Sequence, residues 1–159
     1  MVGEVVLGMP VVGEPRAAAP VRLELERDGR RYSLHVLDAG LACCTVEVAA
    51  ALLDGDAARE PGTLPPAEPG ATVDVLVVSG TVSRSLAPVL RRVYEAPPSP
   101  PLVVSFGACC ASGGPYWDSY SVLPGLDGVL PVDIVVPGCP PPPGALLEAL
   151  ETLAARGAS

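Results

Sequence analysis

The sequence predicts a single α/β domain in which helices cover both faces of a mostly parallel sheet. Three apolar runs of strand length, at 73–80, 102–108 and 132–138, each contain a glycine at or near their end. Such unbroken runs are typical of strands buried on both faces, and segments with helical spacing alternate with them along the chain. A length of 159 residues with 49% apolar content is enough for one domain with its own core.

The first predicted elements form a β-hairpin followed by a helix. Apolar and polar residues alternate over 21–27 and again from Tyr32, and Asp28-Gly29 between them is a turn signal. We expect the second strand to run to Asp38. The segment "CCTVEVAAALL", 43–53, then has apolar residues at helical spacing. Residues 1–20, punctuated by glycine and proline, support no prediction.

The remaining elements follow in order along the chain. A polar loop at 54–71 precedes the strand at 73–80, and an apolar stripe predicts a helix within 83–96. Ser85 could cap this helix, and Pro88 would fall in its first turn, where proline is tolerated. After the strand at 102–108 we expect a loop with a helical turn at 113–128, then a buried strand at 132–138. The helix at 145–155 is the last element.

Charge and cysteine usage exclude several classes of protein. The net charge is −8 and the isoelectric point is near 4.5, which argues against binding to nucleic acid or to an anionic membrane surface. Glu4 stands where a signal peptide would be basic, and no run reaches the roughly 18 apolar residues of a membrane span. We therefore expect a cytosolic chain, or one held at a membrane by partners. In that compartment five cysteines indicate metal binding or catalysis rather than disulfides.

The cysteines occur in three groups, each just after the end of a predicted strand. Cys43 and Cys44 follow the hairpin, Cys109 and Cys110 follow 102–108, and Cys139 follows 132–138. Because the carboxyl ends of parallel strands share one edge of a sheet, these groups can converge there. Glycines, which let the backbone approach a ligand closely, accompany them. They are Gly40, Gly107, Gly113, Gly114 and Gly138.

Convergent thiolates are the ligands of zinc or of an iron–sulfur cluster. Structural zinc usually uses C-x2-C pairs, and the chain has none. Cysteines from three separate loops suit a larger group such as a cubane cluster. The alternative is that they are small buried hydrophobic residues, as free cysteines often are. The coincidence of three groups at three strand ends favours the metal centre.

Four stretches carry a resemblance to a known family. They are "ACCTVE", "VSGTVSRSLAPVLRRVYE", "SFGACCASGGPYWDSYSVLPGLDGVLPVDIVVPGCPP" and "ALLEAL". The chain resembles the B subunit of respiratory complex I (NADH–quinone oxidoreductase, 20 kDa subunit type), which is related to nickel–iron hydrogenase small subunits. The resemblance implies a flavodoxin-like three-layer sandwich with a mostly parallel sheet. We then expect an N-terminal extension with a hairpin at 1–31 and an iron–sulfur domain at 32–159.

The resemblance also implies the cofactor, one [4Fe–4S] cluster, and its ligands Cys43, Cys44, Cys109 and Cys139. Cys109 is chosen over Cys110 because the ligand of the family lies four residues before the first glycine of the Gly-Gly pair, here Gly113. Cys110 is then a spare buried thiol. The hydrogenase relatives have C-x-x-C at the first site, so the adjacent Cys43-Cys44 pair favours the complex I type. Two neighbouring thiolates can reach different iron atoms of one cubane only where the backbone is neither regular strand nor regular helix. We therefore expect strain at the strand-to-helix junction after Gly40.

The function that the resemblance implies is electron transfer from the cluster to quinone, in a subunit of a complex I-like NADH:quinone translocase. The implied partners are the large hydrogenase-like (49 kDa-type) subunit, an upstream iron–sulfur subunit and the membrane subunits, with quinone at the subunit interface and no nucleic acid. The chain would be peripheral on the cytoplasmic side of the cell membrane. The alternatives are a membrane-bound hydrogenase-type small subunit, or a divergent paralogue with an altered or absent quinone site.

The chain departs from the family pattern near the quinone cavity. Where the family has P-G-C-P-P-R-P-E, this chain reads "PGCPPPPG", so Pro142 and Gly144 replace an Arg and a Glu. The segment 54–72 is shorter than in the family and lacks the two motifs expected there. The N-terminal hairpin also stands in place of a membrane-facing helix. The cysteine motifs, in contrast, are intact.

Single residues near these motifs have two interpretations each. Glu47 could couple protons to electron transfer, or it could be an acidic residue favoured by the helix dipole. Arg84, Arg91 and Arg92 could place positive charge near the cluster or lie on a solvated helix face. His35 is expected to be structural. The aromatic residues Tyr116, Trp117 and Tyr120 could face a partner or quinone, or pack inside.

Overall fold

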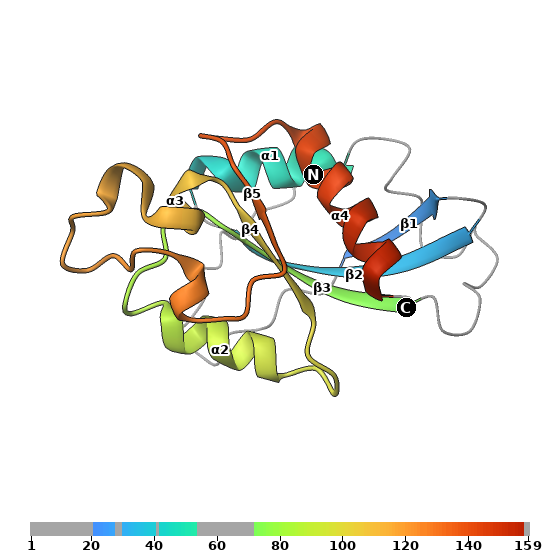
Figure 1. Cartoon of the computed structure of the whole chain (residues 1–159), viewed down its shortest axis with the longest axis horizontal. Coiled ribbons are helices and arrows are strands. Elements are labelled where there is room, and N and C mark those ends of the chain that lie inside the picture. Colours follow the sequence, from blue (N-terminus) through green and yellow to red (C-terminus); the bar gives the residue numbers. More distant parts are fainter. Residues whose placement is uncertain (1–20, 28–29, 41, 54–71, 158–159) are drawn as a thin grey trace, which may run out of the picture.

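The computed structural model describes residues 21–27, 30–40, 42–53 and 72–157, so the predicted polar loop at 54–71 lies outside the described residues. Figure 1 labels the elements. The strands are β1 (Val21–Arg27), β2 (Arg30–Gly40), β3 (Thr72–Ser79), β4 (Leu102–Phe106) and β5 (Ile134–Val136). The helices are α1 (Ala42–Leu53), α2 (Ala87–Glu95), α3 (Ala108–Ser112) and α4 (Pro143–Gly157), with short 3-10 turns η1 (Gly114–Tyr116) and η2 (Leu126–Gly128).

The five strands form one sheet in the order β1-β2-β3-β4-β5. β1 pairs antiparallel with β2, with Val21 opposite Val36, and the other three pairings are parallel. The predicted hairpin and parallel sheet are therefore confirmed. The second hairpin strand continues to Gly40, two residues beyond the predicted end.

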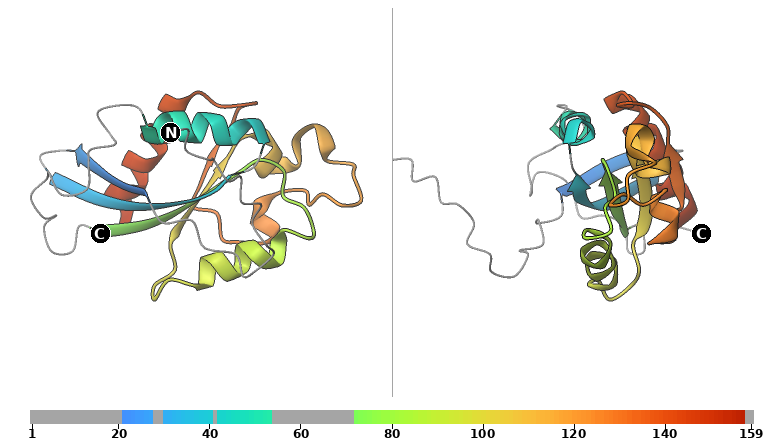
Figure 2. Two further views of the ribbon diagram at one scale, coloured as in Figure 1. Left: turned by 180° about the vertical axis from the view of Figure 1, so that it is seen from behind. Right: turned by 90° about the vertical axis from the view of Figure 1, so that its left-hand side faces the viewer.

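Helices cover both faces of the sheet, as predicted. α1 and α4 lie together on one face, and α2 lies on the other (Figures 1 and 2). Side chains of β3 alternate between two apolar clusters, as the pleat of a strand requires. Val75 and Val77 pack with α1 and α4, whereas Leu76 and Val78 pack with α2. These two clusters make the chain a three-layer sandwich.

The order of the strands differs from the flavodoxin order 2-1-3-4-5, in which the strand after the first helix lies outermost. Here β1, which precedes that helix in sequence, occupies the outer position beside β2. The steps from β2 to β3 and from β3 to β4 run in the same direction, yet α1 and α2 lie on opposite faces (Figure 1). The two crossovers therefore have opposite hands, although nearly all such crossovers are right-handed.

Three local predictions need correction. The last strand is not buried on both faces, because β5 is at the edge of the sheet and Val135 is 51% exposed. Ser83, not Ser85, supports the start of α2, because its Oγ accepts a hydrogen bond from the Leu86 N–H (3.1 Å). The short helix α3 was not predicted. Pro88 does lie in the first turn of α2, as expected.

Candidate metal centre

The loops that follow β4 and β5 are joined by backbone hydrogen bonds at the carboxyl edge of the sheet. The Gly107 N–H donates to the Val136 carbonyl (2.8 Å), and the Ala108 N–H donates to the Gly138 carbonyl (2.7 Å). These bonds continue the parallel pairing one step beyond the strands. They place the start of α3, which carries Cys109, beside the backbone that leads into Cys139.

The first cysteine loop meets this pair at Gly107. A Cβ at Gly107 would lie 2.7 Å from the Sγ of Cys44 and 3.6 Å from the Gly138 carbonyl oxygen. Gly107 also has φ of +96°, a conformation that residues with a side chain rarely adopt. Only glycine therefore allows Cys44 to approach the other two loops this closely. The predicted convergence of the three strand ends is confirmed at this position.

The junction before the cysteine pair is strained, as predicted. Ala42 has φ of +61°, in the left-handed region that costs a non-glycine residue about 1–2 kcal/mol. We expected the pair itself to lie in neither strand nor helix, and this is wrong, because Cys43 and Cys44 lie in the first turn of α1. The irregular residue is the one before them. Cys43 is exposed and Cys44 is buried.

The second cysteine pair divides between two environments. Cys109 is half-buried, and a Cβ at Gly114 would lie 2.9 Å from its Sγ. Cys110 is fully buried in the apolar cluster on the α2 side, together with Leu76 and Val103. The two thiols therefore have different surroundings, and Cys110 has those of a core residue.

Three of the thiols influence one another. The pKa of Cys44 is raised to about 11, chiefly by burial and also by the neighbouring thiols of Cys43 and Cys109, while a backbone hydrogen bond from Gly80 lowers it. Burial likewise raises the pKa of Cys110 to about 11. Without a bound cation, Cys44 is thus protonated at neutral pH. A metal ion reverses this, because a coordinating thiol loses its proton.

The donor set does not form a site for a single ion. Among the described residues, no three His, Cys, Asp or Glu side chains come together as ligands of one metal ion. Cys139 is exposed and directly follows Gly138, so it belongs to the same edge through its backbone. A cubane binds each thiolate at a separate iron atom, so its ligands lie farther apart than those of zinc. Thiols on three loops of one edge are compatible with this requirement.

Two buried hydroxyls near Cys44 were not singled out from the sequence. Thr45 Oγ1 and Ser79 Oγ are buried and form no hydrogen bond in the described structure. Ser79 ends β3 on the same side as Val77, which packs in the cluster that contains Cys44. Buried hydroxyls without a partner are unusual, and sulfur atoms of a bound group would supply acceptors. The polar residue at the end of the apolar run "VDVLVVSG" is the signal that could have revealed Ser79.

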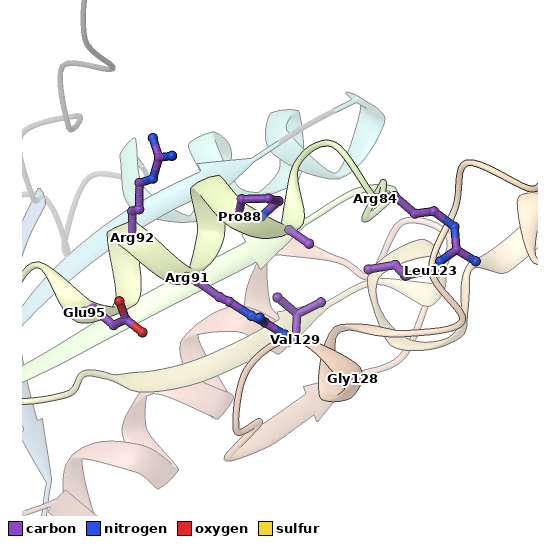
Figure 3. A pocket seen from close by; sticks show the side chains of 9 residues that line it. Arg84, Pro88, Arg91, Arg92, Glu95, Leu123, Gly128 and Val129 are labelled. Atoms are coloured by element: carbon purple, nitrogen blue, oxygen red, sulfur yellow. The ribbon is translucent and has the colours of Figure 1, made fainter.

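The other charged or titratable residues singled out from the sequence lie in α1, in β2, and in or beside α2. Glu47 is half-buried in α1, and His35 lies in β2, where its side chain is outside the described part. Arg84, Arg91 and Arg92 line a groove beside α2 in which no lining residue is a cysteine (Figure 3).

The aromatic residues after α3 are not packed inside. Tyr116, Trp117 and Tyr120 are 56%, 70% and 91% exposed. Of the two interpretations given above, internal packing is therefore wrong, and these side chains face outward.

Comparison with known proteins identifies the family. The family model "NADH ubiquinone oxidoreductase, 20 Kd subunit" matches residues 31–153. The chain belongs to this family. The B 2 subunit of NADH-quinone oxidoreductase from Streptomyces griseus subsp. griseus is 52% identical over 123 residues, which are 77% of this chain and 52% of that protein. The B 1 subunit from Salinispora tropica is 48% identical over 140 residues, covering 88% of this chain and 71% of that protein.

A solved structure from a different complex shares the fold. It belongs to the membrane-bound sulfane sulfur reductase, an archaeal respiratory membrane complex, with a TM-score of 0.54 and 28% identity over 75% of this chain and 69% of that one. The chain spans about half the length of the Streptomyces relative. No helix in the described ranges is long and apolar enough to cross a membrane.

Proposed function

We propose that the chain is the electron-transfer subunit of a complex I-like NADH–quinone oxidoreductase and binds one [4Fe–4S] cluster that delivers electrons to quinone. The observation that carries this proposal is the meeting of three loops at Gly107, which brings Cys44 against the loops that bear Cys109 and Cys139. Membership of the 20 kDa subunit family supports it.

Cys43, Cys44, Cys109 and Cys139 would hold the cluster, which supplies one-electron redox chemistry when bound. Cys110 would not take part, because it lies in the apolar cluster on the α2 side. The ligand set draws on all three loops of the edge.

The remaining residues of the site shape its surroundings. Gly107 and Gly114 leave room beside the sulfur atoms of Cys44 and Cys109. The Gly80 backbone lies where it can hydrogen-bond to the Cys44 sulfur and so stabilise its thiolate. The burial of Cys44 keeps water from one side of the site. Hydrogen bonds and burial of this kind set the potential of an iron–sulfur centre.

Glu47 is the residue that we assign to proton coupling. It lies in α1, one helical turn after the cysteine pair, and its side chain is half-buried. The observation that supports the assignment is this position of a carboxylate beside the proposed cluster ligands.

In the assembled complex the chain would be peripheral on the cytoplasmic side of the cell membrane. It would be held there by the 49 kDa-type subunit, an upstream iron–sulfur subunit and the membrane subunits, with quinone between this chain and the large subunit. Residues 1–31 would be an extension of the iron–sulfur domain at 32–159.

A second candidate function is electron transfer to an acceptor other than quinone. The fold is shared with a chain of a sulfane sulfur reductase, and the segment 54–72 lacks the family motifs expected near quinone. Reduction of a quinone analogue by the purified complex would favour the first function, and reduction of polysulfide alone would favour the second.

The cofactor is tested by purifying the full chain under anaerobic conditions and measuring iron, zinc and acid-labile sulfide. We expect equal amounts of iron and sulfide in the ratio of one cubane per chain, and a paramagnetic signal after reduction. A chain that holds no iron, or only zinc, would refute the cluster.

A further inference from the structure

A groove runs between α2 and the segment 123–129, away from the cysteine loops, and has a volume of about 500 Å³ (Figure 3). That size lies within the usual range of ligand pockets. Its lining combines arginines with an apolar floor. The charged lining is Arg84, Arg91, Arg92 and Glu95, and the apolar lining includes Pro88, Leu123 and Val129.

The groove concentrates positive charge in a chain that is strongly acidic. Three of the ten basic residues line it against one carboxylate, Glu95, although the net charge of the chain is −8. Arg91 and Arg92 are exposed, and neither forms an ion pair with a described residue. Each retains the planar set of donors that suits a carboxylate or a phosphate.

Arg84 is held in place at one end of the groove. Its Nε donates to the Tyr120 carbonyl (2.8 Å), and its backbone N–H donates to the Ser121 carbonyl (2.9 Å). The terminal nitrogens remain available for an anion. The side chain of Tyr120, 91% exposed, belongs to the same loop. Arginine and tyrosine together are typical of the residues that dominate binding energy at protein interfaces.

The arrangement of charge discriminates between ligands. The guanidinium groups of Arg84 and Arg91 lie at separate positions along the groove, and Arg92 points away from Val129 (Figure 3). A ligand with two separate anionic groups therefore matches this arrangement better than a single phosphate. A net charge of −8 disfavours approach to an anionic membrane, whereas a polypeptide segment can contact the groove alone.

We propose that this groove binds an acidic segment of a partner polypeptide, with two carboxylates on Arg84 and Arg91 and an apolar side chain between them. The apolar side chain would rest on Pro88, Leu123 and Val129, which form the floor. The proposal does not depend on the cofactor.

The test uses the full chain and a fluorescein-labelled peptide array in which two glutamates flank a leucine at increasing spacings, read by fluorescence anisotropy. At least one of these peptides should bind the chain, and its affinity should fall as the salt concentration rises. The same peptide with glutamine in place of both glutamates should not bind. Arg91→Glu should weaken binding by about tenfold or more, the usual effect of a lost charge-assisted hydrogen bond. Arg156→Glu, an exposed arginine of α4 outside the groove, should change it less than twofold.

Several outcomes would overturn the proposal. One is that no peptide distinguishes Arg91→Glu from Arg156→Glu, provided that circular dichroism shows both variants folded. Another is that millimolar inorganic phosphate displaces the peptide fully, which would assign the groove to a free anion. A third is capture of the chain by phosphatidylglycerol vesicles that Arg91→Glu abolishes, which would assign it to a lipid headgroup.

Discussion

At the scale of single residues, Gly107 decides whether the three cysteine loops can meet. Its missing side chain leaves the space that the Sγ of Cys44 occupies, and its φ of +96° starts α3 in the orientation that presents Cys109. Ala42, with φ of +61°, likewise sets the orientation in which α1 starts, and this conformation is strained for alanine. Backbone strain of this kind persists only where the surrounding structure enforces it.

Gly107→Ala should lower the free energy of unfolding by about 1–3 kcal/mol, because the new methyl group meets the Cys44 sulfur in a strained conformation. Urea unfolding measures the change. Gly128→Ala is the control, since a Cβ there meets no atom within 4 Å. Equal stability of the two variants would contradict the account of Gly107.

Ser79→Ala should lower the midpoint potential of the bound cluster, since a hydroxyl that donates to sulfur stabilises the reduced state. Ser105→Ala is a matched control. Its Oγ is also buried, but strand alternation places it on the α2 side with Val103, where it lies beside the thiol of Cys110. Redox titration followed by electron paramagnetic resonance gives both potentials. An unchanged potential in Ser79→Ala, with the cluster intact, would exclude this role.

The site residues differ in how far the sequence predicts them. The cysteine groups follow strand ends, so their convergence could be predicted from the common edge of parallel strands. The polar end of the run 73–80 marks Ser79, but the roles of Ser79 and Gly80 could not be predicted, because they depend on which face of β3 carries α1. Strain was expected at the junction after Gly40, but not that Ala42 would carry it, since no propensity rule places alanine in the left-handed region.

At the scale of elements, hydrophobic spacing predicts the long helices and the central strands. α3 was missed because five residues between glycines, Ala108–Ser112, are too few to show a period. The exposure of β5 was missed because an apolar run does not reveal whether its strand is central or at the edge. Its neighbour on one side is β4, and no strand of the described ranges pairs with its other side.

The start of α4 offers a test at this scale. Gly144 lies in the first turn of α4, is exposed, and has no atom within 4 Å of a Cβ built on it. Gly144→Ala should therefore raise the free energy of unfolding by about 0.4–1 kcal/mol, because alanine loses less conformational entropy on folding. Thermal unfolding measures this. A lower melting temperature would mean that the backbone at Gly144 is not that of a regular helix.

At the scale of the whole molecule, the α/β class and the covered sheet follow from the alternation of strands and helices. The order of the strands does not follow from this alternation. The antiparallel β1 takes the outer position beside β2, and α1 and α2 lie on opposite faces although the strands advance in one direction. Local sequence patterns do not encode which strand lies outermost, so the opposite hands of the two crossovers could not be predicted.

The proposed cluster lies at the carboxyl edge of the sheet, and the arginine groove lies beside α2. These sites lie on different elements, so a charge change in the groove should leave the cluster intact. The two proposals can therefore fail independently.

The most direct test of the central claim is electron paramagnetic resonance of the reduced, anaerobically purified chain in three forms. Wild type and Cys110→Ala should both show the signal of one [4Fe–4S] cluster, and Cys109→Ala should show none. Of these two cysteines, Cys109 lies at the carboxyl edge of the sheet, whereas Cys110 lies in the apolar cluster on the α2 side. Loss of the signal in Cys110→Ala with retention in Cys109→Ala, or no cluster in the wild type, would contradict the account.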